Sequence, residues 1–212
     1  MAAPISHRDL MFAASAKEPF SRPGWIYELK HDGFRVLVVK QGSEVQLITL
    51  HGTDLAKAFP ELVVEAELLP NAVLDGELVL LDEHGKPQFE SLCRRVRMTR
   101  LPLRVAGAPD AAAIFAFDLL QLAGEDLRPL PLIKRKAILQ KVLWGSVRIR
   151  YLQHIDEEGE ALYRSIAEAG LEGMVAKRAT APYRAGRSCY WLKVKTPAFK
   201  AIEQRRLGHK RK

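Results

Sequence analysis

The strand-like runs of this sequence arrive mainly in adjacent pairs, and this pattern constrains the fold more than any other feature. Residues 25–50 predict a meander of three strands, separated by the turns His31-Asp32-Gly33 and QGSE. Further strands are expected in 72–82, 112–124, 148–155, 172–178 and 189–195. Because the strands outnumber the helices and do not alternate strictly with them, we expect an α+β fold, with antiparallel sheets flanked by helices.

Helices are expected at three places. Residues 55–70 favour helix on both sides of Pro60, and residues 131–143 have helical spacing after a proline. Residues 156–170 predict a helix with Asp156 as N-cap and Gly170 just after its end.

Composition is that of a globular protein. The chain has 212 residues, of which 48% are hydrophobic, enough for one large domain or two small ones. No run approaches the roughly 18 apolar residues of a membrane-spanning helix, and LMFAASA at 10–16 is read as an ordinary N-terminal segment. Cys93 and Cys189 are far apart and match no metal spacing, which fits a reducing compartment. We therefore expect an intracellular protein that is not bound to a membrane.

The positive charge is concentrated in two segments. From Lys193 onward there are eight basic residues and one acid, Glu203, so this segment carries +7 of the net charge of +8. A second cluster in 91–104 contains five arginines and no acid: Arg94, Arg95, Arg97, Arg100 and Arg104. Two such clusters suggest a polyanion partner, although a solvated tail and a basic surface helix would look the same. The candidate contacts with such a partner are Arg94, Arg95, Arg97, Arg205 and Arg206.

Lysines at strand ends are the first candidates for chemistry. Lys30 closes the run WIYELK, and a lysine is nucleophilic only as a neutral amine, which requires burial or neighbouring cations. In CYWLKVK the period of two puts Trp191, Lys193 and Lys195 on one face, with the lysines about 7 Å apart. Such a pair could bind phosphate and lower the pKa of a third lysine. The alternative is an edge strand whose lysines prevent aggregation.

Two acids and one aromatic ring complete the candidates. Glu77 in LDGELV and Glu172 in LEGMVAKR stand within or beside apolar strands, where a pair of carboxylates would suit Mg²⁺. Each could equally be an ordinary strand-edge charge. Phe117 alternates with Phe115, so it could stack on a purine or simply belong to the core.

The order of these motifs is more specific than any one of them. ELKHDGFR, LDGELV, FAFDLL, LEGMVAKR and WLKVK resemble the nucleotidyltransferase motifs of ATP-dependent DNA ligases. The phrases FPEL, DLRPLPLIKRK and APYRAGRSCYWLKVK are most similar to the ligase domain of the bacterial end-joining ligase D family. The resemblance runs from about residue 20 to 197. It implies the ligase and capping-enzyme nucleotidyltransferase fold with a central nucleotide cleft, an adenylation domain over 1–197, and a basic tail over 198–212.

The resemblance also implies the covalent step. Lys30 would attack the α-phosphate of ATP and hold AMP as lysyl-AMP, and Lys193 and Lys195 would contact the α-phosphate. Glu77 would bind the ribose and support Mg²⁺, and Glu172 would be the second metal carboxylate. AMP would then pass to a DNA 5′-phosphate, and the neighbouring 3′-hydroxyl would displace it and seal the nick.

The remaining nucleotide contacts follow from the same motifs. Glu28 would lie beside the adenine, with Leu29 in the same binding set, and Phe117 would stack on the base. Arg35 would lie near the ribose and the nick, and Lys177 would make a further nucleotide contact. The implied partner is nicked double-stranded DNA in repair and recombination, handled by a monomeric bacterial protein of the cytoplasm and nucleoid.

The sequence departs from the family in two ways. The segment TLHGTD has His51 roughly where the family has an arginine, and a histidine is mostly neutral near pH 7. The chain also has only 17 residues after Lys195, too few for the OB-fold domain that closes over the nucleotide in these ligases. The ending GHKRK favours a natural terminus. We therefore expect slow self-adenylation, better activity on nicks that are already adenylated, and room for a separate protein that supplies the OB-fold or a repair function.

Two other functions remain open at this point. RNA ligation or RNA capping shares the Lys-x-Asp-Gly core, and competition between DNA and RNA nicks would separate it from DNA ligation. A nucleic-acid-binding accessory protein could keep the fold without the activity, although Lys30, Glu77, Glu172, Lys193 and Lys195 are all intact.

Overall fold

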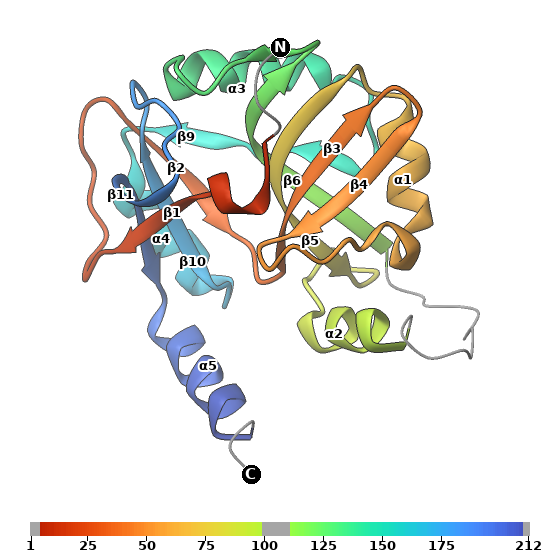
Figure 1. Cartoon of the computed structure of the whole chain (residues 1–212). Coiled ribbons are helices and arrows are strands. Elements are labelled where there is room, and N and C mark those ends of the chain that lie inside the picture. Colours follow the sequence, from red (N-terminus) through yellow and green to blue (C-terminus); the bar gives the residue numbers. More distant parts are fainter. Residues whose placement is uncertain (1–4, 99–110, 210–212) are drawn as a thin grey trace. The chain divides into compact units, whose positions relative to one another are not determined.

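The computed structural model describes residues 5–98 and 111–209, and its strands form two sheets (Figure 1). The chain divides into two compact units by its internal contacts. Unit 1 contains Met1–Leu10, Asp32–Leu152 and Pro182–Ala185, and unit 2 contains Met11–His31, Gln153–Ala181 and Gly186–Lys212. Each unit has its own sheet and its own core, so the two are described in turn.

Unit 1 is built on a sheet with the strand order β4-β3-β5-β6-β7, and β8 pairs with β6. Its strands are β3 (Phe34–Gln41), β4 (Glu44–Thr49), β5 (Ala72–Leu81), β6 (Ala111–Leu122), β7 (Glu125–Asp126) and β8 (Ile149–Tyr151). Its helices are η1 (His7–Asp9), η2 (Ala56–Ala58), α1 (Pro60–Glu67), α2 (Phe89–Met98) and α3 (Leu132–Val142). The side chains Val36, Leu47, Leu62, Leu74 and Ile114 belong to one buried core in which α1 packs on the sheet.

Unit 2 is built on a sheet with the strand order β1-β11-β10-β2-β9. Its strands are β1 (Met11–Ser15), β2 (Trp25–Lys30), β9 (His154–Asp156), β10 (Gly173–Arg178) and β11 (Gly186–Lys195), and its helices are α4 (Gly159–Glu168) and α5 (Pro197–His209). Helix α4 packs on this sheet, and the core between them contains Tyr27, Ile166, Met174, Ala176 and Val194. Because these residues alternate along each strand, the opposite face of the sheet carries the remaining side chains.

The expected α+β class is confirmed, with two parallel pairings that the sequence did not predict. β1 runs parallel to β11, and β6 runs parallel to β8. Helix α3 lies between β6 and β8 in the chain and packs on β6. A crossover through a helix is what a parallel neighbour requires.

The expected three-strand meander over 25–50 is wrong for its first strand. β3 and β4 form a hairpin, but β2 pairs with β10 and β9 in the other sheet. The segment 31–33 therefore joins the two units instead of turning a hairpin. A Cβ atom on Gly33 would lie 2.3 Å from the carbonyl oxygen of Leu78, so the chain needs glycine here in order to pass close to β5.

Two other expectations are corrected around residue 150. The strand expected over 148–155 is two strands, β8 and β9, that belong to different sheets. Asp156 is not the N-cap of α4: it ends β9 opposite Ile26, and the N-cap residue is Glu158. Gly170 follows the end of the helix in a left-handed conformation, as expected.

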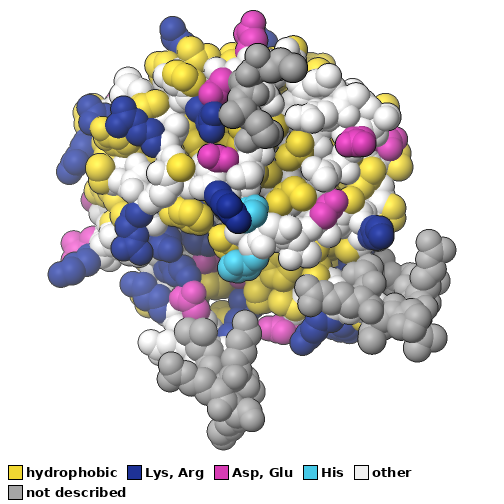
Figure 2. Space-filling model, viewed as in Figure 1, with side chains coloured by type: hydrophobic (Ala, Val, Ile, Leu, Met, Phe, Trp, Pro, Cys, Tyr) yellow, Lys and Arg dark blue, Asp and Glu magenta, His cyan; other side chains and the backbone are white. Residues whose placement is uncertain are grey.

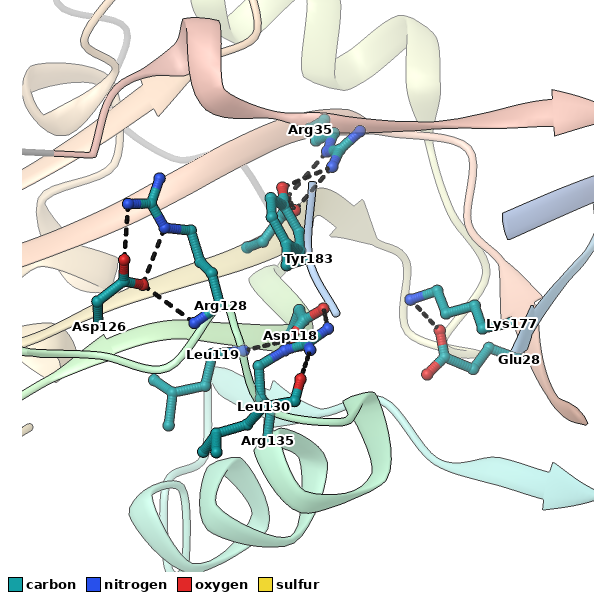
Figure 3. A network of polar contacts seen from close by, with 11 residues as sticks. Glu28, Arg35, Asp118, Leu119, Asp126, Arg128, Leu130, Arg135, Lys177 and Tyr183 are labelled. Carbon is teal, nitrogen blue, oxygen red and sulfur yellow. Dashed lines mark hydrogen bonds and ion pairs between the residues drawn. The ribbon is translucent and has the colours of Figure 1, made fainter. Parts of the chain in front are cut away.

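A fully buried ion pair ties α3 to the sheet of unit 1 (Figure 3). The guanidinium of Arg135 donates to both carboxylate oxygens of Asp118 on β6, at 2.7 and 2.8 Å, and to the carbonyl of Leu130. Both charged side chains have no exposed surface. Removal of one partner from such a pair leaves an uncompensated buried charge, which is far more costly than loss of a surface pair.

We predict that Asp118→Asn lowers the free energy of unfolding by about 3 kcal/mol or more, because it leaves the buried Arg135 without its counter-ion. The matched control is Asp126→Asn, which disrupts the partly exposed Arg128–Asp126 pair and should cost less than about 1 kcal/mol. Urea unfolding monitored by circular dichroism measures both values. Equal losses in the two variants would contradict the prediction.

Within 5–98 and 111–209, no helix is long and apolar enough to cross a membrane.

Candidate functional site

The register of three neighbouring strands places three lysines of unit 2 on one face of the sheet. Lys30 on β2 lies opposite Gly173 on β10, which lies opposite Lys195 on β11. In the next row of this face, Lys193 lies opposite Val175 of β10. Lys193 and Lys195 therefore lie on one face of β11, as expected. The register of β2 places Lys30 on the same face of the sheet.

Gly173 is the residue between Lys30 and Lys195 in the first row. Its φ is +157°, and a Cβ atom here would lie 2.1 Å from the carbonyl oxygen of Val194. Glycine therefore allows β10 and β11 to approach closely at this row. It also leaves no side chain between the two lysines.

Glu172, the residue just before β10, balances part of the positive charge of Lys30 and Lys195. Its Oε1 lies 2.7 Å from the Nζ of Lys30 and 3.4 Å from the Nζ of Lys195. The Glu172 side chain is only 4% exposed, so these contacts occur where solvent screening is weak. One carboxylate thus serves both lysines of the row.

A second acid comes from helix α5. Glu203 accepts a hydrogen bond from Lys195 at 2.6 Å, and this bond, followed by the charges of Lys195, Lys30 and Lys193, lowers the pKa of the Glu203 carboxyl. The helix that carries Glu203 starts next to Thr196, whose hydroxyl accepts from the backbone N–H of Phe199 at 3.3 Å. Sequence reasoning counted Glu203 only as the lone acid of a basic segment.

The lysines affect one another electrostatically. The pKa of Lys193 is lowered by burial first, and then by the positive charges of Lys30 and Lys195, with Glu203 and Glu172 acting in the opposite sense. The neighbouring His31 is affected more strongly: burial and the charge of Lys30 lower its pKa to about 4. In both groups burial is the main cause of the lowered pKa, and the charge of Lys30 adds to it.

A buried pair flanks the lysines on the same face (Figure 3). The Nζ of Lys177 lies 2.6 Å from Oε2 of Glu28 and 4.2 Å from the ring centroid of Trp191. The side chains of Lys177 and Glu28 are 2% and 1% exposed. Leu29 has the opposite orientation in β2 and packs on the core, so its side chain does not share this face with Glu28 and Lys30.

Unit 1 contains the predicted nucleotide contacts Arg35, Glu77 and Phe117, and Arg35 makes contacts with several neighbours. The Nε and Nη2 of Arg35 donate to Oδ1 and Oδ2 of Asp75 at 2.9 and 2.7 Å, and the hydroxyl of Tyr183 donates to Oδ2 at 2.6 Å. Burial alone would lower the pKa of Arg35, but the charge and hydrogen bonds of Asp75 outweigh burial and raise it. Arg35 is therefore held as a fixed cation.

Phe117 and Glu77 both lie next to Arg35. The Arg35 guanidinium is 5.5 Å from the centroid of the Phe117 ring, and Arg35 is directly opposite Glu77 in the β3–β5 pairing. The β5–β6 register shifts beside Asp75, so that Phe117 is the extra residue of a β-bulge. Bulges change the direction of a side chain, which separates Phe117 from the simple alternation expected with Phe115.

Comparison with known proteins identifies the family. Residues 11–195 match the model of the ATP dependent DNA ligase domain. The chain belongs to this family. The chain is 35% identical to the multifunctional non-homologous end joining protein LigD of Pseudomonas aeruginosa over 186 residues, which are 86% of this chain and 21% of that protein. It is 30% identical to the SPbeta prophage-derived DNA ligase-like protein LigB of Bacillus subtilis, covering 87% of this chain and 66% of that protein.

Solved structures agree with this assignment. The mycobacterial DNA ligase D complexed with ATP and MES matches with a TM-score of 0.72 and 26% identity, covering 88% of this chain and 60% of that one. The ligase domain of LigD from M. tuberculosis matches with a TM-score of 0.71 and 29% identity, covering 88% and 59%. The fold is that of the ligase nucleotidyltransferase domain, as the sequence predicted. The chain spans between a fifth and two thirds of the relatives it matches.

The residues that ligase-family resemblance assigns to Mg²⁺ are divided between the units, with Glu172 in unit 2 and Glu77 in unit 1. No group of three or more histidine, cysteine or acidic side chains that could hold a metal occurs among the described residues. Mg²⁺ commonly binds through one or two carboxylates together with substrate phosphates and water. A buried Glu172 beside Lys30 and Lys195 fits that mode.

The predicted DNA-binding arginines differ in what they contact. Arg95 donates to the carbonyl of Ala58 at 3.0 Å, pairs with Glu61 at 2.7 Å, and lies over the Phe59 ring, so it anchors α2 within unit 1. Arg94 and Arg97 are exposed on the same helix. Basic side chains are visible at the position of α2 in the space-filling view (Figure 2). These two remain candidates for contact with a polyanion.

The remaining basic residues singled out from the sequence lie on α5, in a turn, or outside the described residues. Arg205 is exposed on α5, and the guanidinium of Arg206 lies 5.7 Å from the Phe199 ring. Arg100 and Arg104 lie outside the described residues. His51 is exposed in the turn after β4.

Besides Glu203, sequence reasoning missed three residues of the site. Asp75 and Tyr183 stand in the quoted phrases LDGELV and APYRAGRS, but neither was assigned a role. Gly173, in LEGMVAKR, was also passed over. Asp75 and Gly173 belong to the ordered motifs and Tyr183 to a phrase quoted beside them, yet only the strand register and the side-chain contacts show what they do.

We predict that acid destabilises the protein partly through His31. Because its pKa is about 4 in the folded state and about 6.5 when unfolded, stability is retained above pH 6.5 and falls as the pH decreases toward 4. The loss between pH 7.5 and pH 5 is about 2 kcal/mol for this group. Urea unfolding at both pH values should show a smaller loss for His31→Asn than for the wild type. Identical losses would contradict the prediction.

Proposed function

We propose that this chain is the adenylation domain of an ATP-dependent DNA ligase, which forms lysyl-AMP on Lys30 and uses it to seal nicked DNA in repair. The observation that carries the proposal is the row of Lys30, Gly173 and Lys195, with Lys193 beside it and Glu172 between the two charged ends. The family match over 11–195 supports the same function.

Lys30 is the nucleophile in this proposal. Its nitrogen attacks the α-phosphorus of ATP, a P–N bond forms, and pyrophosphate leaves with the electron pair of the broken P–O bond. An ion pair with Glu172 favours the ammonium form of Lys30, so the attack requires that this 2.7 Å contact opens and that the proton leaves. Lys193 and Lys195 stabilise the negative charge that develops on the phosphoryl oxygens.

The later steps transfer AMP to the DNA and then release it. The DNA 5′-phosphate displaces Lys30 from phosphorus and takes AMP, and the 3′-hydroxyl then displaces AMP and seals the strand. Arg94 and Arg97, exposed on α2, are candidates for contact with the duplex backbone.

Unit 1 supplies nucleoside recognition. Phe117 offers a ring for the adenine, Glu77 a carboxylate for the ribose, and Arg35 a fixed guanidinium beside both. In unit 2, the Lys177–Glu28 pair supports adenine recognition next to the phosphate lysines.

Glu172 in unit 2 and Glu77 in unit 1 are the carboxylates that we assign to Mg²⁺, which when bound would neutralise pyrophosphate as it leaves. Glu172 already combines burial with two cationic neighbours. A carboxylate held at this position can exchange a lysine partner for another cation without leaving the site.

We predict that the wild type becomes labelled when incubated with [α-³²P]ATP and Mg²⁺, and that Lys30→Ala does not, because it lacks the attacking nitrogen. Lys200→Ala, which removes an exposed lysine of α5, is the control and should label normally. A pre-adenylated nicked duplex is offered in parallel. Sealing without labelling would restrict the function to the last step, and absence of both signals would contradict an enzymatic role.

We predict that Glu203→Gln strengthens ATP binding about three- to tenfold. The Glu203 carboxylate accepts a hydrogen bond from Lys195 at 2.6 Å, and the α-phosphate of ATP has to displace this carboxylate in order to contact Lys195. Glu168→Gln, on α4, makes the same change of net charge away from the lysines and should bind like the wild type. Titration calorimetry on Lys30→Ala backgrounds measures binding without reaction. Weaker binding by Glu203→Gln than by Glu168→Gln would show that Glu203 supports the site.

A further inference from the structure

Tyr183 is not among the residues assigned to nucleotide binding, but its hydroxyl contacts one of them, Arg35. Its hydroxyl donates to Oδ2 of Asp75 at 2.6 Å and accepts from Nη2 of Arg35 at 3.3 Å. Since Arg35 also donates to Oδ2 of Asp75 at 2.7 Å, the three groups form a closed triangle of hydrogen bonds. Asp75 is fully buried and Tyr183 is 4% exposed.

The Tyr183 ring is fixed by its own surroundings. Its backbone N–H donates to the carbonyl of Arg128 at 2.8 Å, and the guanidinium of Arg135 lies 5.8 Å from its ring centroid. Arg135 is itself held by the buried Asp118 (Figure 3). The hydroxyl is therefore presented from a rigid support, which is what positioning of another side chain requires.

Arg35 is the group that this support acts on. Asp75 alone fixes two of its nitrogens, but an arginine side chain can move with its carboxylate partner. The Tyr183 hydroxyl adds a contact to both members of the pair, from the segment 182–185, a different part of the chain from either β3 or β5. The guanidinium is held in this way 5.5 Å from the ring centroid of Phe117.

We propose that Tyr183 is a positioning residue for nucleotide recognition, acting through Arg35. The inference rests on the proposed function, in which Arg35, Glu77 and Phe117 bind the nucleoside part of ATP. Tyr183 touches no substrate in this proposal: it orients the Arg35–Asp75 pair. Because the phosphoryl chemistry depends on the lysines of unit 2, loss of the hydroxyl affects the use of ATP as a ligand more than the bond-forming step.

Tyr183→Phe removes the hydroxyl and keeps the ring on Arg135. We expect the KM for ATP in Lys30 adenylation to rise about tenfold, with the rate at saturating ATP changed by less than twofold. In an Arg35→Lys background the same substitution should change KM by less than twofold, because the group it acts through has been replaced. Tyr27→Phe is the control, since it deletes another buried hydroxyl that binds a backbone N–H, and it should leave KM unchanged.

A second readout does not need activity. In the ¹⁵N spectrum of the wild type, the Nε–H signal of Arg35 should be protected from solvent exchange, and Tyr183→Phe should accelerate its exchange at least tenfold. If the wild type neither labels nor seals nicks, the proposed function fails while this spectrum still tests Tyr183. Unchanged Arg35 exchange, or equal effects of Tyr183→Phe with Arg35 and with Lys at position 35, would overturn the proposal.

Discussion

The pairing of β2, β10 and β11 is the constraint on which the site in unit 2 depends. Side chains alternate along a strand, so a shift of one residue in β10 would turn Lys30 or Lys195 away from the other. The observed register sets Gly173 between them, and the glycine permits a backbone approach that a Cβ atom would block at 2.1 Å. The same register directs Met174 and Val194 into the core. Burial of that core therefore fixes the arrangement of the face that carries the lysines.

Three lysines on one face create a repulsive arrangement that unit 2 balances locally. Glu172 is shared by Lys30 and Lys195, and Glu203 adds a second carboxylate to Lys195. Burial, followed by the charges of Lys30 and Lys195, lowers the pKa of Lys193. These contacts involve single points of charge on flexible side chains, so partners can exchange when a phosphate or a metal ion arrives.

Much of this could be predicted from the sequence, and the misses have physical causes. Strand alternation was sufficient to predict that Lys193 and Lys195 share one face of their strand. The ordered motifs were sufficient to predict that Lys30 belongs to the same site. The sequence could not show that β2 leaves the meander, because its apolar pattern suits either sheet and only the long-range pairing with β10 decides. Glu203 and Tyr183 were missed for a related reason. The contacts of Glu203 with Lys195 and of Tyr183 with Arg35 join different elements, and no local sequence pattern encodes them.

The two units solve different chemical problems with different cations. Arg35 and Arg135 in unit 1 are held by two-point contacts to buried aspartates, and a guanidinium keeps its charge under all relevant conditions. In the proposed function this suits the orientation of a nucleoside, where the geometry must not change. The proposed nucleophile, Lys30, must instead lose its charge in order to react, which a lysine amine can do and a guanidinium cannot. Permanent cations in unit 1 and lysines with exchangeable partners in unit 2 would therefore meet the different needs of recognising AMP and of transferring it.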